Sequence, residues 1–171
     1  MSPPHPAALP PVELLTACDT RRLRRGGPGG QHRNKVETAV VLTHRPTGIS
    51  AQASERRSQS ANQRRALQRL RIELALQVRC SLDATKQVRP SQRWKSRIDG
   101  GRISVNPDHE DFPALVAEAL DILDVAEFDL STAARQLQVT SSQLGKFLKL
   151  ESTVWQRVSA ERNKRGLRPL K

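Results

Sequence analysis

The sequence predicts an α+β fold in which a small β-sheet carries a packed amphipathic helix and a projecting Gly-Gly-Gln loop, followed by a mainly helical C-terminal domain. Three observations predict it. Apolar residues alternate with polar ones over residues 38–53, recur at three- and four-residue steps after Ser58, and form helical stripes between turn signals after residue 110. The expected parts are a disordered N-terminus (1–11), the Gly-Gly-Gln domain (12–83), a basic linker (84–93), the helical domain (94–165) and a basic tail (166–171).

The first domain reads as three strands and one helix. A short apolar run, Val12–Ala17, precedes them. The expected elements are, in order, a strand at Cys18–Leu23, a single turn at Asn34–Glu37, a strand at Thr38–His44, a reverse turn at Arg45–Gly48 and a strand from Ile49 to Ala53. From Ser58 the period becomes helical, and the stripe consists of Leu67, Leu70, Leu74 and Val78.

The second domain opens with a hairpin signal over Trp94–Asn106. Asp99-Gly100-Gly101 is the expected turn, and Lys95 and Arg97 are expected to share one face of the first strand. Asp111 before Phe112-Pro113 predicts a helix start.

Residues 131–150 have the apolar spacing of a helix-turn-helix, with Gln138 where that motif often has Gly. Thr140 or Ser141 is expected to cap its second helix. Any pair of short packed helices needs similar spacing, so both interpretations stay open. A final helix is expected at Thr153–Lys164, ending towards Gly166.

Composition indicates a polyanionic partner, because the formal net charge is +12. The charge is uneven: residues 103–130 contain eight acidic residues and no basic ones, whereas the segments before and after them are net basic. With 3% aromatic residues, phosphate contacts rather than base stacking should dominate RNA binding.

Several classes of protein are disfavoured. Cys18 and Cys80 lie far apart and the four histidines are scattered, so we expect no metal and no cofactor. No segment approaches the roughly 18 apolar residues of a membrane span. The first residues resemble neither a signal peptide nor a transit peptide, and we therefore expect a cytoplasmic protein.

An ordered series of motifs runs from Asp19 to Leu76. It contains Gly-Pro-Gly-Gly-Gln-His (27–32), Asn34-Lys35, Thr38-Ala39-Val40, Thr43-His44-Arg45-Pro46-Thr47-Gly48-Ile49, Glu55-Arg56-Arg57-Ser58-Gln59 and Asn62. This series resembles the catalytic domain of class I peptide chain release factors and their codon-independent ribosome-rescue relatives. Two departures, Arg25-Gly26 and Arg33, leave the tip intact.

The resemblance implies a ribosome-dependent peptidyl-tRNA hydrolase whose catalytic residues are Gly29, Gly30 and Gln31. It implies that the Gln31 N–H donates to the leaving 3′-oxygen or to the developing intermediate, while its side-chain amide limits and orients a water molecule. Loop support or rRNA contact is expected from Gly27, Pro28, His32, Asn34 and Lys35. The expected RNA-binding residues are Arg24, Arg25, Arg33, Arg57, Lys95, Arg97, Arg162, Lys164, Arg165 and Arg168.

Only about 20 residues precede the first matched strand, and no codon-reading tripeptide is recognisable. We therefore expect codon-independent rescue of stalled ribosomes or large subunits by a monomer whose partners are the ribosome and peptidyl-tRNA, with no membrane partner. Two alternatives stay open: a non-catalytic ribosome- or RNA-binding adaptor, and a DNA-binding regulator that uses residues 131–150.

Overall fold

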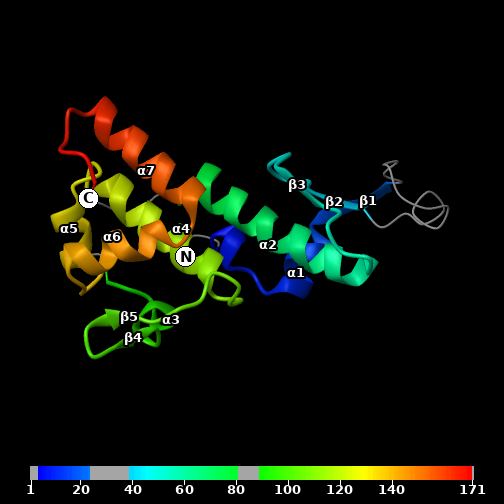
Figure 1. The fold of residues 1–171 in the computed structure, drawn as a ribbon, viewed down its shortest axis with the longest axis horizontal. Helices are drawn as coiled ribbons and strands as arrows, with labels where there is room; N and C mark the ends of the chain where they lie inside the picture. Colours follow the sequence, from blue (N-terminus) through cyan, green and yellow to red (C-terminus); the bar gives the residue numbers. More distant parts are fainter. Residues whose placement is uncertain (1–3, 24–38, 81–88, 171) are drawn as a thin grey trace. The chain divides into compact units, whose positions relative to one another are not determined.

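The computed structural model describes residues 4–23, 39–80 and 89–170, and the chain forms two compact units, Met1–Leu74 and Ala75–Lys171 (Figure 1). Helix α2 (Gln59–Gln77) crosses the boundary between them, which therefore lies within a helix and not after residue 83. Two small antiparallel sheets and seven α-helices within the described ranges confirm the predicted α+β class. None of the helices in these ranges is both long enough and apolar enough to cross a membrane.

The first unit is built on an antiparallel sheet with strand order β1-β2-β3, from strands Cys18–Leu23, Ala39–His44 and Ser50–Ala53. The predicted strands are confirmed to within a residue or two. Val40, Leu42 and His44 of β2 are buried while Val41 and Thr43 between them are partly exposed, so the period-two pattern places one face of β2 in the core. Val40 pairs with Ala53, and Leu42 pairs with Ala51.

The turn between β2 and β3 is the reverse turn that the sequence predicts. Gly48 has φ +71°, a conformation that an L side chain rarely adopts. Its N–H donates to the His44 carbonyl at 2.8 Å, and the His44 N–H donates to the Ile49 carbonyl at 2.8 Å. His44 Nδ1 lies 2.8 Å from the Thr47 hydroxyl, which ties the buried imidazole to the same turn.

Arg45 joins this turn to the start of β1. Its guanidinium donates to the carbonyls of Thr16 and Cys18, at 2.6 and 3.1 Å, and its Nη1 lies 3.1 Å from a carboxylate oxygen of Asp19. Its backbone N–H donates to the Ala17 carbonyl at 3.0 Å. Arg45, in the turn after β2, thus ties this turn to the start of β1.

Helix α2 covers the sheet through the stripe Leu67, Leu70 and Leu74, as predicted, although Val78 falls just past its end. Arg69 donates to the Gln52 carbonyl of β3 at 2.8 Å and also pairs with Glu55. The amide of Asn62, fully buried, accepts from the Arg56 N–H at 2.9 Å and donates to the Arg56 carbonyl at 2.8 Å. Glu55 and Asn62 therefore hold the segment that connects β3 to α2.

The sequence predicts disorder over residues 1–11, but residues 5–11 contain ordered structure. Pro6–Ala8 forms the 3₁₀ helix η1, Pro11–Thr16 forms α1, and Ala7 is fully buried. His5 caps η1, because its Nδ1 accepts from the Ala7 N–H at 3.0 Å. Arg71 of α2 donates to the Ala7 carbonyl at 3.0 Å. Prolines at the first helical positions have φ already fixed, which lowers the entropy lost on ordering.

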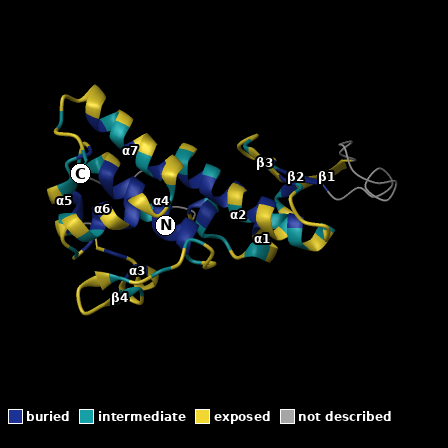
Figure 2. Ribbon diagram, viewed as in Figure 1, coloured by how far each residue is buried: buried dark blue, intermediate teal, exposed yellow. Residues whose placement is uncertain are grey.

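The core of the second unit forms around α4 (Phe112–Val125), a helix with eleven buried residues among its fourteen (Figure 2). Trp94 and Phe112 each meet Phe147 edge to face, with ring centroids 5.4 and 5.6 Å apart. The Trp94 indole N–H donates to the Leu137 carbonyl at 2.9 Å, so this buried polar group is satisfied. Helices α5 (Leu130–Gln136), α6 (Ser141–Lys149) and α7 (Ser152–Lys164) complete the unit.

The predicted hairpin is wrong in its first half. Trp94 lies in the short helix α3 (Gln92–Lys95), and the strands are only β4 (Ile98–Asp99) and β5 (Arg102–Ile103). Ser91 explains the difference: its hydroxyl caps α3 by accepting from the Trp94 N–H at 3.0 Å, and it donates to Glu118 of α4 at 2.6 Å. Lys95 therefore lies in a helix and Arg97 in the turn that follows it, not on one strand face.

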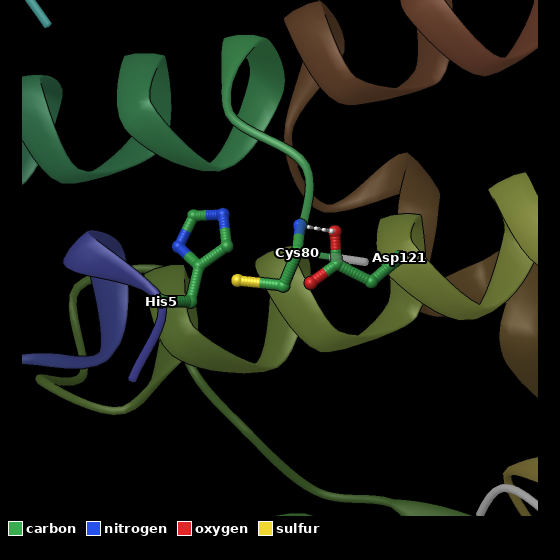
Figure 3. A group of neighbouring side chains, drawn as sticks. All are labelled: His5, Cys80 and Asp121. Atoms are coloured by element: carbon green, nitrogen blue, oxygen red, sulfur yellow. Dashed lines mark hydrogen bonds between the residues drawn. The ribbon is translucent and has the colours of Figure 1, made fainter. Parts of the chain in front are cut away.

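A buried carboxylate on α4 secures the end of α2 to the second unit. Asp121 is 6% exposed, and its Oδ1 lies 2.7 Å from Arg79 Nη1 and accepts from the Cys80 N–H at 3.2 Å (Figure 3 shows Cys80 and Asp121). Burial raises the pKa of the Asp121 carboxyl, and the Arg79 charge opposes that change.

The three C-terminal helices follow the sequence prediction closely. Gln138, in the turn between α5 and α6, has φ +58°, which explains why Gly is common at that point of the motif. The Thr140 hydroxyl caps α6 by accepting from the Gln143 N–H at 3.2 Å. Gly166, at φ +66°, follows the end of α7, as predicted.

Candidate active site

The paired strands β1 and β2 hold both ends of the segment that carries Gly29, Gly30 and Gln31. In their register Leu23 lies opposite Ala39, the last pair before the connection. Six consecutive pairs, from Cys18 with His44 to Leu23 with Ala39, fix the two strands antiparallel. Leu23 and Ala39, which flank residues 24–38 (here called the Gly-Gly-Gln loop), are thus fixed next to each other at one end of the sheet.

The predicted catalytic and support residues lie outside the described ranges, as do three of the predicted RNA-binding arginines. These residues are Gly27, Pro28, Gly29, Gly30, Gln31, His32, Asn34 and Lys35, with Arg24, Arg25 and Arg33. Their roles therefore stay predictions, as does the turn at Asn34–Glu37.

Strand β1 adds two cations that the sequence reasoning did not select. Arg21 and Arg22 are both exposed, and Leu23, at the end of the strand, is 41% exposed. Adjacent residues of a strand point to opposite faces, so these two arginines place positive charge on both sides of the strand that enters the loop. Their position directly before Arg24 and Arg25 was the available signal: four arginines lie within five residues.

Two titratable groups near the β1–β2 pair are structural. Burial lowers the pKa of His44, and the neighbouring Arg45 charge lowers it further. Burial raises the pKa of the Cys18 thiol, which therefore stays protonated and unreactive at neutral pH. Neither group is a suitable proton-transfer residue. Within either unit, the described residues contain no three His, Cys, Asp or Glu side chains that converge as metal ligands.

Arg162 requires a correction to the predicted RNA-binding set. It is 8% exposed, and its guanidinium donates to the Phe128 carbonyl and to the Arg168 carbonyl, the latter at 2.7 Å from Nη2. The Leu167 N–H donates to the Arg162 carbonyl at 3.0 Å. Arg162 therefore anchors the segment after α7 to the second unit, and this geometry does not support an RNA contact.

Three other predicted cations are engaged by carboxylates. Arg97 lies 2.6 Å from Asp111, which also pairs with Arg93 at 3.2 Å. Lys164 and Arg165 lie 3.1 and 2.6 Å from Glu161. These pairs are partly exposed, so their net contribution to stability is small.

The remaining described members of the set are accessible: Arg57 lies in the bend before α2, Lys95 in α3 and Arg168 beyond α7, and all three are exposed. They are separated along the chain and do not form one described patch. The structure thus leaves the Gly-Gly-Gln loop, with the cations of β1 at its base, as the candidate active site.

Comparison with known families assigns the class of this chain. The model of the RF-1 domain matches residues 16–107, more than half of the chain, so the chain belongs to the RF-1 domain family of class I peptide chain release factors. The match includes the β1–β2 pair, the Gly-Gly-Gln loop and α2, and it ends after β5. Residues 108–171 lie beyond it.

Relatives of known name agree with this family. The chain is 59% identical over 51 residues to the chloroplastic peptide chain release factor PrfB1 of Arabidopsis thaliana, covering 30% of this chain and 11% of that protein. It is 45% identical over 74 residues to peptide chain release factor 1 of Caldicellulosiruptor saccharolyticus, covering 40% and 21%. It is 48% identical over 77 residues to peptide chain release factor 1 of Verminephrobacter eiseniae, covering 43% and 20%. The chain spans between a tenth and about a fifth of these relatives' lengths. No solved structure matches it.

Proposed function

We propose that this chain hydrolyses the ester that joins a nascent peptide to tRNA on the ribosome, without reading a stop codon. The observation that carries the proposal is the Gly29-Gly30-Gln31 tip inside the matched residues, on a loop whose two ends are paired by β1 and β2. The proposed partners are the ribosome and peptidyl-tRNA, the proposed setting is the cytoplasm, and the proposed active form is a monomer.

In the proposed reaction a water molecule attacks the ester carbonyl carbon. The bond from that carbon to the 3′-oxygen of the terminal adenosine breaks, which leaves a free peptide carboxyl group and a 3′-hydroxyl on the tRNA. The Gln31 N–H donates to the oxygen on which negative charge develops, and the Gln31 side-chain amide limits and orients the water. Donors fixed in place before charge develops are the largest single contribution in many hydrolases.

The two glycines have a conformational role in this proposal. Gly29 and Gly30 allow the backbone to turn the Gln31 N–H towards the reacting ester, and a Cβ at either position obstructs that turn. The cations around the loop, including the exposed Arg21 and Arg22, have an electrostatic role: they meet rRNA phosphates and hold the tip in place.

We also propose that the substrate is a particle whose peptidyl-tRNA has no readable stop codon, either a stalled ribosome or a separated large subunit. The second unit supports this proposal, because it offers exposed cations such as Lys95 and Arg168 to RNA. This unit would identify the particle, and the first unit would supply the tip.

The test is peptide release from purified particles. Three substrates carry the same peptidyl-tRNA: ribosomes on an mRNA truncated at the P site, ribosomes with a stop codon in the A site, and isolated large subunits. Release from the truncated complex or the large subunit, without stimulation by the stop codon, supports the proposal. Binding to all three without release contradicts it and favours the adaptor.

Variants at the tip separate the backbone donor from the side chain. Gly29→Ala and Gly30→Ala should each lower the release rate by an amount equivalent to about 3–4 kcal/mol, the cost of removing one oxyanion donor. Gln31→Ala keeps its backbone N–H and should lose less. A larger loss for Gln31→Ala than for either glycine variant would refute the backbone-donor mechanism.

A further inference from the structure

The carboxylates of the second unit are largely engaged inside that unit. Each of six acidic residues there has a hydrogen bond or an ion pair to a neighbour. They are Asp111 with Arg97, Glu118 with Ser91, Asp121 with Arg79, Asp129 with Thr132, Glu151 with Thr153, and Glu161 with Arg165. Where the partner is an arginine, as for Asp111, Asp121 and Glu161, the two opposite charges largely cancel at a distance. The outward charge of this unit therefore depends on where its free lysines and arginines lie.

One such surface is a stripe along α6 formed by Ser142, Lys146 and Lys149. All three are exposed, and their spacing of four and three residues places them on one face of the helix. The opposite face, which includes Leu144, Phe147 and Leu148, is buried. Helix α6 contains no acidic residue, and among the residues that the structure describes no carboxylate pairs with Lys146.

The stripe lies on the second of two short helices, α5 and α6, whose sequence has the apolar spacing of a helix-turn-helix. Helices α5 and α6 are joined by a tight turn in which Gln138 has positive φ and Thr140 caps α6. Lys149 is held 4.8 Å from the ring centroid of Trp155 in α7, which limits its side-chain freedom. In DNA-binding proteins with a helix-turn-helix, the second helix is the one that lies against the DNA duplex.

The aromatic residues restrict the kind of nucleic acid. Binding of single strands relies on exposed rings on which bases stack. This chain has three Phe, two Trp and no Tyr. Phe112, Phe128, Phe147 and Trp94 are buried, and the ring of Trp155 is covered by Lys149. The surface can therefore contact phosphates but offers no stacking platform.

We propose that the α6 stripe binds the phosphate backbone of double-stranded RNA. Lysines recognise phosphates as point charges, and duplex RNA is bound mainly through its shape and its phosphates rather than through its deep, narrow major groove. The choice of RNA over DNA rests on the proposed function at the ribosome. The helix-turn-helix thus serves to hold a rigid RNA arm, not to read a DNA sequence.

The test measures binding of the full chain to a labelled 20-base-pair RNA duplex of mixed sequence, between 50 and 200 mM salt. The test variant is Lys146→Gln with Lys149→Gln, since Gln retains helix propensity. The matched control is Arg93→Gln with Arg157→Gln, which removes two charges from residues already paired with Asp111 and Glu161. A second control, Lys146→Arg with Lys149→Arg, keeps both charges. Thermal melting of each variant verifies folding.

The stripe variant should bind the duplex about tenfold more weakly and flatten the slope of log affinity against log salt by about two, because two phosphate contacts are lost. Both controls should stay near the native affinity. Equal weakening by the Arg93/Arg157 variant, or tighter binding to a DNA duplex or single-stranded RNA of the same sequence, would overturn the proposal.

Peptide release is measured separately on ribosomes, so the two proposals can fail independently. If the chain releases peptide but the stripe variant binds the duplex as well as the native chain does, only this inference is overturned. If the stripe variant binds the duplex more weakly but the native chain releases no peptide, this inference is supported and only the proposed hydrolase activity is overturned.

Discussion

Arg162 shows how differently arginines of one chain can be used. Its guanidinium is bound by backbone carbonyls at 8% exposure, whereas Arg57 is exposed on a bend. Replacing Arg162 by Met leaves the Phe128 and Arg168 carbonyls without their donor, which should cost about 2 kcal/mol of unfolding free energy. Arg57→Met should change the free energy of unfolding by less than about 0.5 kcal/mol.

Urea unfolding of the two variants checks this contrast. A shift of the midpoint for Arg162→Met alone is expected. Equal stability of the two variants would show that Arg162 is not an anchor.

His44 makes the stability of the first unit depend on pH. Because burial lowers its pKa in the folded protein, the unfolded chain binds a proton more readily than the folded one. The stability that the neutral imidazole contributes is fully present above the unfolded pKa of about 6.5. It is lost as the pH falls from there through the lower pKa of His44 in the folded protein.

Urea midpoints at pH 7.5, 6.5 and 5.5 test this. The native chain should lose more stability over this range than His44→Gln, which cannot titrate. Identical pH profiles would rule out His44 as the source.

At the scale of elements, one glycine lowers the stability of helix α6. Gly145 lies within this helix, and a Cβ built on it meets nothing within 4 Å. Gly145→Ala should therefore stabilise the protein by about 1 kcal/mol, the difference in helix propensity.

The matched control is Gly166→Ala, because Gly166 has φ +66° and an L side chain there is strained. This second change should cost about 1–2 kcal/mol. Thermal melting should move in opposite directions for the two variants. A decrease for Gly145→Ala would mean that the helix cannot accept the methyl group.

The sequence predicted elements best where one local signal acted alone. From Val40 onward β2 alternates between buried and partly exposed residues, and Thr140 and Gly166 are at the ends of helices where their chemistry indicates. The hairpin failed because two signals overlapped. Trp94, Ser96 and Ile98 alternate like a strand, but the Ser91 cap and the contact of Trp94 with Phe147 make the segment helical.

The candidate site was predictable only in part. The Gly-Gly-Gln tip and its order among neighbouring motifs are visible in the sequence. The partners of individual cations are not visible there. Arg162 and Arg165 look alike in the sequence, but Arg162 is buried against carbonyl groups, whereas Arg165 pairs with Glu161 and lies over Phe128. Such differences arise from tertiary packing, which local pattern does not encode.

At the scale of the whole molecule, the charge of +12 should make ribosome binding strongly dependent on salt. Affinity for isolated large subunits should fall by at least about tenfold between 50 and 200 mM salt, because each phosphate contact releases counterions. Replacing the exposed Arg57 and Lys95 by glutamine should reduce the slope of log affinity against log salt by about one to two. An affinity that does not change with salt would exclude phosphate contacts as the main source of binding.

The pairing of Leu23 with Ala39 has a practical consequence for protein engineering. The segment between them begins and ends at two backbone positions about 5 Å apart, the ordinary separation of partners in any antiparallel ribbon. Residues 24–38 can therefore be exchanged as a cassette with the corresponding segment of a relative, with the junctions at these two residues and the sheet unchanged. A set of such chimaeras would show whether peptide release follows the exchanged segment or the rest of the chain.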